Sequence, residues 1–271
     1  MIASDNFSLE GKTAYILGSS GLIGSDVSLQ MAKSGCKVIL LDNDIKSSKR
    51  ILKIVKEFSK DSKEAYFDCS DMENLEENFE NLIMKFSVPD IFINCSYPRT
   101  KDWALSSFKK IKLESFRTNI DIHLNSYSWL SKLMADSMKA NNIEGSIILT
   151  GSMYGHRGQD MSLYKGANLE ENMVYPVIKS GILNLVRQMA SYYGQNNIRI
   201  NCVSPGGLEG PIAGKRESQD DKFKKKYKEK TPLGRMAKPI DVSNAMIFLA
   251  CDASSYITGQ SINVDGGISI I

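Results

Sequence analysis

The 271-residue sequence lacks the features that mark membrane, exported or nucleic-acid-binding proteins. No apolar run approaches the ~20 residues that a membrane-spanning helix needs. The first ten residues have neither the basic start nor the apolar core of an export signal. The formal net charge of +3 is too small to indicate nucleic acid or a membrane surface as a partner. We therefore expect a cytoplasmic protein that binds neither.

Residues that ligate metals or form disulfides are also scarce. The chain has two histidines, and its five cysteines include no Cys-x-x-Cys pair, so no metal site is expected. Most of the cysteines adjoin apolar residues, which is typical of small buried side chains in a reducing compartment. A chain of this length can bury a core large enough to fold without such cross-links.

One local basic patch is present, at residues 223–230 with the sequence FKKKYKEK. Such a run is most often the solvated face of a helix. The alternative is a lid whose charge attracts an anionic substrate.

What the sequence does contain is a regular alternation of short apolar runs with segments of helical periodicity. The expected strands are residues 13–17, 37–41, 65–67, 90–94, 145–150, 199–203 and 261–264. The expected helices are residues 24–34, 45–58, 75–86, 113–141, 173–194 and 241–251. Continuously apolar strands separated by helices are typical of a parallel sheet that is buried on both faces. We predict an α/β fold, a single Rossmann-like domain over residues 1–271 with a doubly wound parallel sheet of about seven strands.

Two stretches, residues 156–172 and 206–231, show no clear periodicity. They follow the fifth and sixth expected strands, so they should lie at the carboxyl edge of the sheet, where ligands bind. We expect residues 206–231 to form a substrate loop or lid.

A glycine-rich turn follows the first expected strand, where Gly18, Gly21 and Gly24 recur at every third position before a helix. Such a turn lets the backbone approach a ligand closely, and the helix N-terminus offers free N–H groups to a pyrophosphate. A glycine turn between a strand and a helix near the N-terminus predicts a dinucleotide site.

Asp42 ends the second expected strand, 18 residues after Gly24 and near the ~20 expected for the acid that binds the adenosine ribose. Its charge would repel a 2′-phosphate, and Asn43 rather than an arginine follows it. NAD is therefore favoured over NADP. The alternative is that Asp42 caps the next helix, a role that suits aspartate.

Tyr175 and Lys179 lie four residues apart near the start of a long expected helix, so their side chains share one face. An ammonium group near a phenol stabilises the phenolate and lowers the tyrosine pKa from ~10. The tyrosine could then exchange a proton with a substrate hydroxyl or carbonyl. Ser152 follows the fifth expected strand, where its hydroxyl could orient the substrate oxygen.

In their order along the chain, these motifs resemble the short-chain dehydrogenase/reductase family over nearly its whole length. Further segments that match the family are Phe67-Asp68-Cys69, Asn94, Asn119, Asn201 to Gly206, Thr258-Gly259-Gln260 and Val264 to Gly267. The resemblance implies that Tyr175 is the general acid/base, that Lys179 binds the nicotinamide ribose and that Ser152 holds the substrate oxygen. It also implies that Asn119 anchors a water in a proton relay. The implied cofactor-binding residues are Gly18, Ser20, Gly21, Leu22, Ile23, Gly24, Asp42, Asp68, Cys69, Asn94, Tyr175, Lys179, Pro205, Gly206 and Leu208.

The sequence departs from the family pattern in four places. The glycine spacing is that of nucleotide-sugar epimerases of the extended branch, although the chain length and C-terminus fit the compact branch. Leu17 replaces a usual threonine, and residues 94–97 read Asn-Cys-Ser-Tyr in place of Asn-Asn-Ala-Gly. Tyr175 lies 23 residues after Ser152, a longer separation than the compact branch shows, so the loop 156–172 is enlarged. The enlarged loop is either a tolerated surface insertion or a part that shapes the substrate site.

Three functions are compatible with these residues. The first is an NAD(P)-dependent oxidoreductase acting on a secondary alcohol or ketone of a polar, sugar-like small molecule, since the chain also resembles oxidoreductases of flagellin-modification and surface-sugar biosynthesis. The second is a 3-oxoacyl thioester reductase, and the third is an idle NAD-binding sensor or scaffold.

The family resemblance also implies a homodimer or homotetramer built through residues 113–141 and 173–194. The apolar residues that suggest such an interface, unless the core absorbs them, are Leu124, Trp129, Leu130, Leu133 and Leu185.

Overall fold

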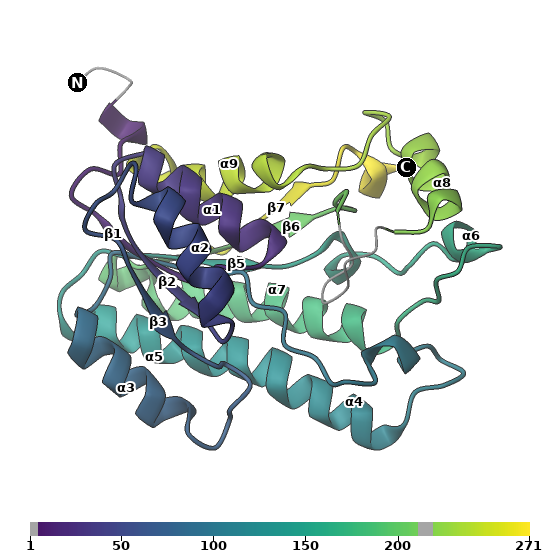
Figure 1. Ribbon diagram of the computed structural model, residues 1–271, viewed down its shortest axis with the longest axis horizontal. Helices are drawn as coiled ribbons and strands as arrows, with labels where there is room; N and C mark the ends of the chain where they lie inside the picture. The colour runs from purple at the N-terminus through teal and green to yellow at the C-terminus, as the bar shows by residue number, and fades with distance from the viewer. Residues whose placement is uncertain (1–4, 211–218) are drawn as a thin grey trace.

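Seven parallel strands form one sheet in the computed structural model, which describes residues 5–210 and 219–271 (Figure 1). The strands are β1 Thr13–Leu17, β2 Lys37–Asp42, β3 Lys63–Tyr66, β4 Ile91–Asn94, β5 Ser146–Thr150, β6 Arg199–Pro205 and β7 Ser261–Val264. Their order across the sheet is β3-β2-β1-β4-β5-β6-β7. The chain therefore winds outward from β1 in one direction and then from β4 in the other. The predicted doubly wound parallel sheet is confirmed.

Helices cover both faces of this sheet (Figure 1). The α-helices of the described residues are α1 Leu22–Lys33, α2 Ile45–Val55, α3 Leu75–Phe86, α4 Leu113–Asn119, α5 Ser126–Ala140, α6 Met161–Tyr164, α7 Val174–Tyr193, α8 Asp221–Lys230 and α9 Pro239–Ala250. Helices α1, α2 and α9 pack on one face, and α3, α5 and α7 pack on the other. None of the helices in the described ranges is long and apolar enough to cross a membrane.

Successive residues of a strand supply the two cores alternately, which explains why the strands are apolar throughout. In β1, Tyr15 and Leu17 belong to the core under α5 and α7, whereas Ala14 and Ile16 belong to the core under α1 and α9. All four side chains are at most 2% exposed. A strand buried on both faces has no solvent-facing side for polar residues, so a short, continuously apolar run is its expected sequence pattern.

The structure differs from the sequence prediction in four helical regions. Helix α1 begins at Leu22, two residues earlier than expected. The single helix expected over residues 113–141 is divided by a π-helical turn, Ile120–Asn125. Two helices, α6 and α8, lie in the stretches that showed no periodicity.

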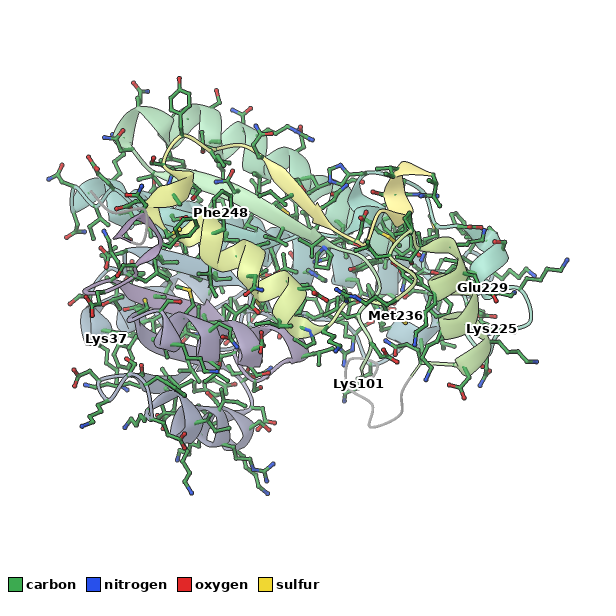
Figure 2. All side chains as sticks on the ribbon, turned by 90° about the horizontal axis from the view of Figure 1, so that it is seen from above. Lys37, Lys101, Lys225, Glu229, Met236 and Phe248 are labelled. Carbon is green, nitrogen blue, oxygen red and sulfur yellow. The ribbon has the colours of Figure 1, made fainter. Side chains whose placement is uncertain are left out.

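Helix α8 had no apolar periodicity to reveal it, because its one buried side chain is Tyr227. The carboxylate of Asp220 caps it by accepting hydrogen bonds from the backbone N–H groups of Lys222 and Phe223. Lys225 and Glu229 lie on its exposed side (Figure 2). The basic run is thus a helix with a solvated face and one buried side chain, that of Tyr227. Residues 211–218 of the expected lid lie outside the described residues.

The apolar residues that suggested a subunit interface divide into two groups. Leu130 is 2% exposed and belongs to the core, and Leu124, Leu133 and Leu185 pack against that core. Trp129 is 43% exposed, and its indole N–H donates to Glu76 Oε1 at 2.6 Å. Core packing therefore accounts for four of the five, and the expected homo-oligomer stays a prediction.

Tyr127 connects α5 to the end of β4, where the functional segments begin. It is fully buried, and its hydroxyl donates to the carbonyl oxygen of Ser96 at 2.7 Å. Replacing Tyr127 with phenylalanine leaves this buried carbonyl without its donor, so we expect the free energy of unfolding to fall by about 1–3 kcal/mol. Chemical denaturation measures the change. Tyr192→Phe is the control, because Tyr192 is 58% exposed and its variant should stay within about 0.5 kcal/mol of the wild type. Equal losses in the two variants would contradict the prediction.

Candidate active site

The carboxyl ends of β1, β2, β4, β5 and β6 lie at one edge of the sheet, because all seven strands are parallel. Each expected site segment follows one of these ends. The glycine turn follows β1, Asp42 ends β2, Asn94 ends β4, Ser152 follows β5 and Pro205 ends β6. The topology therefore brings together segments that lie far apart in the sequence.

The glycine turn leaves no room for side chains at its first and last positions. Gly18 has a φ of +77°, and a Cβ atom there would lie 2.7 Å from the Ser96 backbone. A Cβ atom at Gly24 would lie 2.1 Å from the carbonyl oxygen of Gly18. No side chain caps the N-terminus of α1 at Gly21, so the amide groups of its first turn, which include Leu22 and Ile23, stay available. This cradle fits a pyrophosphate, since the helix dipole also favours an anion there.

Asp42 is joined to the glycine turn. Its Oδ2 accepts a hydrogen bond from the backbone N–H of Ser20 at 2.8 Å, and its Oδ1 accepts from that of Asp44 at 2.9 Å. The cap of α2 is Asp44, whose side chain accepts from the N–H of Ser47. The alternative reading of Asp42 as the helix cap is therefore wrong. Its carboxylate lies instead beside the pyrophosphate cradle, as a ribose-binding acid would.

Three further candidates for cofactor binding lie near the carboxyl ends of β3 and β4, two strands that β2 and β1 separate in the sheet. Asp68 Oδ1 accepts hydrogen bonds from the backbone and hydroxyl of Ser70, and the adjacent Cys69 is 7% exposed. Asn94 is fully buried, with Oδ1 accepting from the N–H of Ser96 at 3.0 Å. Its Nδ2 has no hydrogen-bond partner among the described residues. A buried donor of this kind at the sheet edge fits a bound polar group.

The segment after β6 lies against the start of α1. The N–H of Gly206 donates to the carbonyl of Val264 at 3.0 Å, and Leu208 forms an isolated bridge with Ala237. A Cβ atom at Gly210 would lie 2.9 Å from a methyl carbon of Leu22. The residues after Pro205 therefore border the glycine turn.

Ser152 and Tyr175 meet in the structure although the enlarged loop separates them in sequence. Ser152 is 5% exposed, and its Oγ accepts from the N–H of Tyr154 at 3.1 Å. Tyr175 stands in the first turn of α7, where its N–H donates to Asn172 Oδ1 at 2.8 Å. Burial raises the pKa of Tyr175 to about 12, although the nearby Ser152 hydroxyl acts to lower it. A serine hydroxyl beside the phenol can position a substrate oxygen that exchanges a proton with the phenol.

Lys179 is almost completely buried, with 1% of its surface exposed. Its Nζ donates to the carbonyl oxygen of Thr150 at 2.8 Å and lies 5.6 Å from the ring centre of Tyr175. Burial lowers the pKa of Lys179 from its ordinary value of 10.5 to about 8. Lys179 was expected to lower the pKa of Tyr175, but here burial of the phenol outweighs every favourable contact. Within the described part of the chain, no hydrogen bond joins the two side chains.

Asn119 makes contacts different from those expected of a water anchor. Its Oδ1 accepts from the N–H of Thr100 at 3.0 Å, and its Nδ2 donates to Thr100 Oγ1 and to the carbonyl of Ser115. These bonds fasten the segment after β4 to α4. The predicted role in a proton relay stays a prediction.

Three aromatic rings surround Tyr175, and the sequence motifs assigned none of them. The ring centres of Tyr97, Trp103 and Tyr154 lie 5.9, 6.3 and 6.5 Å from that of Tyr175. Tyr97 stands where the family pattern has glycine, so this departure from the pattern was the feature of the sequence that could have indicated an aromatic ring near Tyr175. The rings form an aromatic wall around the phenol, defined by these three residues.

The enlarged loop packs on α8. Lys230 Nζ forms an ion pair with Asp160 Oδ2 at 2.5 Å, and Lys226 Nζ donates to the carbonyl of Ser162 at 3.0 Å. The hydroxyl of Tyr227 accepts from the N–H of Gly207 at 2.5 Å and contacts the sulfur of Met153. Together they enclose a cavity of about 150 Å³ next to the site, lined by Met153, Tyr154, Arg157, Asp160, Leu163, Lys230, Ile268 and Ile271. No group of three or more possible metal ligands occurs among the residues described.

Comparisons with known proteins agree with this architecture. A family model described as enoyl-(acyl carrier protein) reductase matches residues 18–269. The chain belongs to the short-chain dehydrogenase/reductase family, and it is an oxidoreductase. Family members bind a nicotinamide cofactor and act on small molecules.

Similar proteins include enzymes with different substrates. The chain is 27% identical to post-translational flagellin modification protein A of Campylobacter coli, over 96% of this chain and 98% of that protein. It is 29% identical to 3-oxoacyl-[acyl-carrier-protein] reductase FabG of Thermotoga maritima, over 97% and 99% respectively. Among solved structures, a short-chain dehydrogenase of Leptospira borgpetersenii with bound NAD+ is 31% identical, with a TM-score of 0.79 and coverage of 98% and 95%.

The buried charge of Lys179 predicts a pH-dependent cost in stability. Below about pH 8 the lysine is charged in both folded and unfolded states, so the folded state bears the full burial penalty. Between about pH 8 and 10.5 only the unfolded state keeps the proton, so this contribution to stability rises with pH. Lys179→Met should therefore raise the free energy of unfolding by about 2–3 kcal/mol at neutral pH, a gain that disappears by about pH 10.5.

Denaturation of both proteins across this pH range measures the difference. Lys225→Met is the control, because Lys225 is exposed and its variant should show no such dependence. A Lys179→Met protein that is less stable than the wild type at neutral pH would contradict the prediction.

Proposed function

We propose that the protein is an NAD-preferring oxidoreductase that transfers hydride between nicotinamide and a secondary alcohol or ketone of a polar, sugar-like substrate. The observation that carries this proposal is the placement of Ser152 beside Tyr175, next to the buried Lys179 and at the same sheet edge as the glycine cradle. These groups match the requirements of proton exchange coupled to hydride transfer. Intact Ser152, Tyr175 and Lys179 argue against an idle NAD sensor.

The side chains would divide the chemistry as follows. A nicotinamide cofactor supplies the hydride in reduction and accepts it in oxidation. Tyr175 donates the proton to the ketone oxygen in reduction, or accepts the hydroxyl proton in oxidation. Ser152 holds that oxygen against the phenol. Lys179 donates one hydrogen bond to the carbonyl oxygen of Thr150 and can offer another N–H group to the nicotinamide ribose.

Asp42 supports NAD as the cofactor. Its carboxylate is fixed beside the glycine turn by the N–H of Ser20, where a 2′-phosphate would place a second negative charge. The residues that would hold the cofactor line the same edge, from Gly18 to the uncapped start of α1 and on to the segment after Pro205. A neighbour that is 31% identical binds NAD+.

The aromatic wall supports a sugar-like substrate. The apolar C–H faces of a sugar ring can lie on Tyr97, Trp103 or Tyr154, while its hydroxyl groups keep polar partners. The polar residues that line the cavity are Arg157, Asp160 and Lys230. The similarity to a flagellin modification protein is consistent with such a substrate.

A 3-oxoacyl thioester is the second candidate substrate. The similarity to FabG and the exposed lysines of α8, which could contact an acidic carrier protein, favour it. A screen of sugars, sugar nucleotides and acyl thioesters, followed by NADH absorbance, separates the two. Turnover of acyl thioesters alone would contradict the sugar-like assignment.

Tyr175 and Tyr164 provide a direct test of the proton donor. Tyr175→Phe keeps the ring but removes the transferable proton, so turnover with the best substrate of the screen should fall about 10²–10⁴-fold. NADH affinity should stay within about threefold, since the phenol is not a principal cofactor contact. Tyr164→Phe is the matched control, because its ring packs on Phe223 at 5.7 Å and its hydroxyl accepts from Gln159. An active Tyr175→Phe enzyme beside an inactive Tyr164→Phe enzyme would reverse the assignment.

Asp42 provides the test of cofactor preference. Asp42→Ala removes the charge that repels a 2′-phosphate and the acceptors for ribose hydroxyls, so NADH should bind about tenfold more weakly and its advantage over NADPH should shrink. Fluorescence titration with both cofactors measures the two dissociation constants. Asp44→Ala is the control, since this neighbouring carboxylate caps α2 and should leave their ratio unchanged. A wild-type enzyme that prefers NADPH would refute the proposal.

A further inference from the structure

We propose that His123 is a positioning residue that, together with Thr150, holds the Lys179 ammonium at the active site and keeps it charged. The inference rests on the proposed function, in which Lys179 binds the nicotinamide ribose. His123 belongs to none of the sequence motifs that assigned the site.

His123 reaches Lys179 from the π-helical turn Ile120–Asn125. Its side chain is fully buried, and its Nε2 lies 3.4 Å from Lys179 Nζ. Turns of this kind inside α-helices are rare and frequently occur at functional sites. The turn therefore places one imidazole nitrogen where the buried ammonium needs a second acceptor.

The two candidates on this helical segment differ in what they contact. The amide of Asn119 is used by Thr100 and Ser115, which belong to the segment after β4 and to α4. The imidazole of His123 instead faces α7. Among the described residues, the hydrogen-bond partners of Lys179 Nζ are His123 and the carbonyl of Thr150.

The protonation state of His123 follows from these contacts. An ammonium group only donates, so Nε2 accepts and the proton of the neutral ring lies on Nδ1. Burial and the Lys179 charge lower the pKa of His123 well below its ordinary value, which keeps the ring neutral. The Pro98 carbonyl favours a proton on the ring, although Nδ1 has no well-formed hydrogen bond among the residues described.

A neutral acceptor matters here because burial opposes the charge on Lys179. With its pKa near 8, Lys179 lies close to the point where it loses the proton that makes it a cation. An acceptor at Nε2 stabilises the charged form, and its removal lowers the lysine pKa further. His123 thus extends the pH range over which Lys179 is an ammonium group.

Lys179 is the group that titrates near neutral pH in this cluster. The other titratable or charged groups that surround Lys179 and His123 are Cys95, Tyr97 and Arg99 after β4, Tyr127 of α5, Tyr175 of α7 and Cys202 of β6. Burial raises the pKa of each of these thiols and phenols above its ordinary value. A pH-dependent change in cofactor binding at this place therefore reports on Lys179.

The test is the dissociation constant of NADH for wild type and His123→Leu, measured by fluorescence between about pH 6 and pH 9. Leucine fills similar space but accepts no hydrogen bond, which should lower the pKa of Lys179 by about one pH unit. The dissociation constant should then rise about threefold at about pH 7.5 and about tenfold at about pH 9, and converge with the wild type at about pH 6. A loss that is the same at every pH would show a packing effect and overturn the proposal.

Two matched variants distinguish the loss of the hydrogen-bond acceptor from the loss of the imidazole ring. His123→Gln keeps a carbonyl oxygen at the reach of Nε2 and should restore the wild-type pH profile to within about twofold. His156→Leu changes the other histidine of the chain, which is exposed, and should change nothing. A glutamine variant that behaves like the leucine variant would overturn the proposal.

Nitrogen NMR of histidine-labelled wild-type protein tests the same contact without a substitution at His123. His123 should show the neutral form between about pH 6 and pH 9, with its proton on Nδ1 below about pH 8 where Lys179 is charged, and His156→Leu assigns the signal. A proton on Nε2 below about pH 8, or protonation of the ring between about pH 6 and pH 9, would overturn the proposal. A wild-type protein that binds neither NADH nor NADPH would contradict both the proposed function and the role of His123. If NADH binds but wild type and His123→Leu have identical pH profiles, only the role of His123 is contradicted.

Discussion

The burial of one ammonium group, that of Lys179, is the constraint on which the site depends. A lysine that is 1% exposed requires acceptors, and the structure supplies them from two elements, the end of β5 and the π-helical turn before α5. These contacts tie α7 to the sheet edge, and α7 in turn carries Tyr175. The charge is costly to the fold and useful to the chemistry, a common combination at active sites.

A second constraint is the close approach of backbone segments at the glycine cradle. The turn after β1 passes so near the segment after β4 that a Cβ atom at Gly18 would meet the Ser96 backbone. The same segment then accepts the hydroxyl of Tyr127 and continues into Tyr97 of the aromatic wall. The cofactor cradle and the surroundings of Tyr175 therefore share one piece of chain, so a change at Ser96 or Tyr97 would affect both.

Much of the fold was predictable because each strand supplies two cores and so needs an unbroken apolar run. The strands and the long helices follow that signal, and Ser152, Tyr175 and Lys179 follow the family motifs. Helix α8 was expected only from its basic run, which was read as the solvated face of a helix, since one buried tyrosine among lysines leaves no apolar periodicity. Its attachment to the enlarged loop depends on contacts such as Lys230 with Asp160, between residues far apart in sequence. The loop is thus part of a packed cap beside the cavity, which its composition alone did not show.

By itself, the sequence determined the parallel sheet, the glycine turn, the acid after β2 and the tyrosine–lysine pair, because these depend on local periodicity and short spacings. Only the tertiary structure decided which side chains surround that pair. Asn119 and His123 lie four residues apart on one helical segment, yet the first is bound to Thr100 and Ser115 and the second faces Lys179. The π-helical turn that begins between them changes the direction of the following side chains, and the space left by the packing of α7 on the sheet decides which one can reach the buried ammonium.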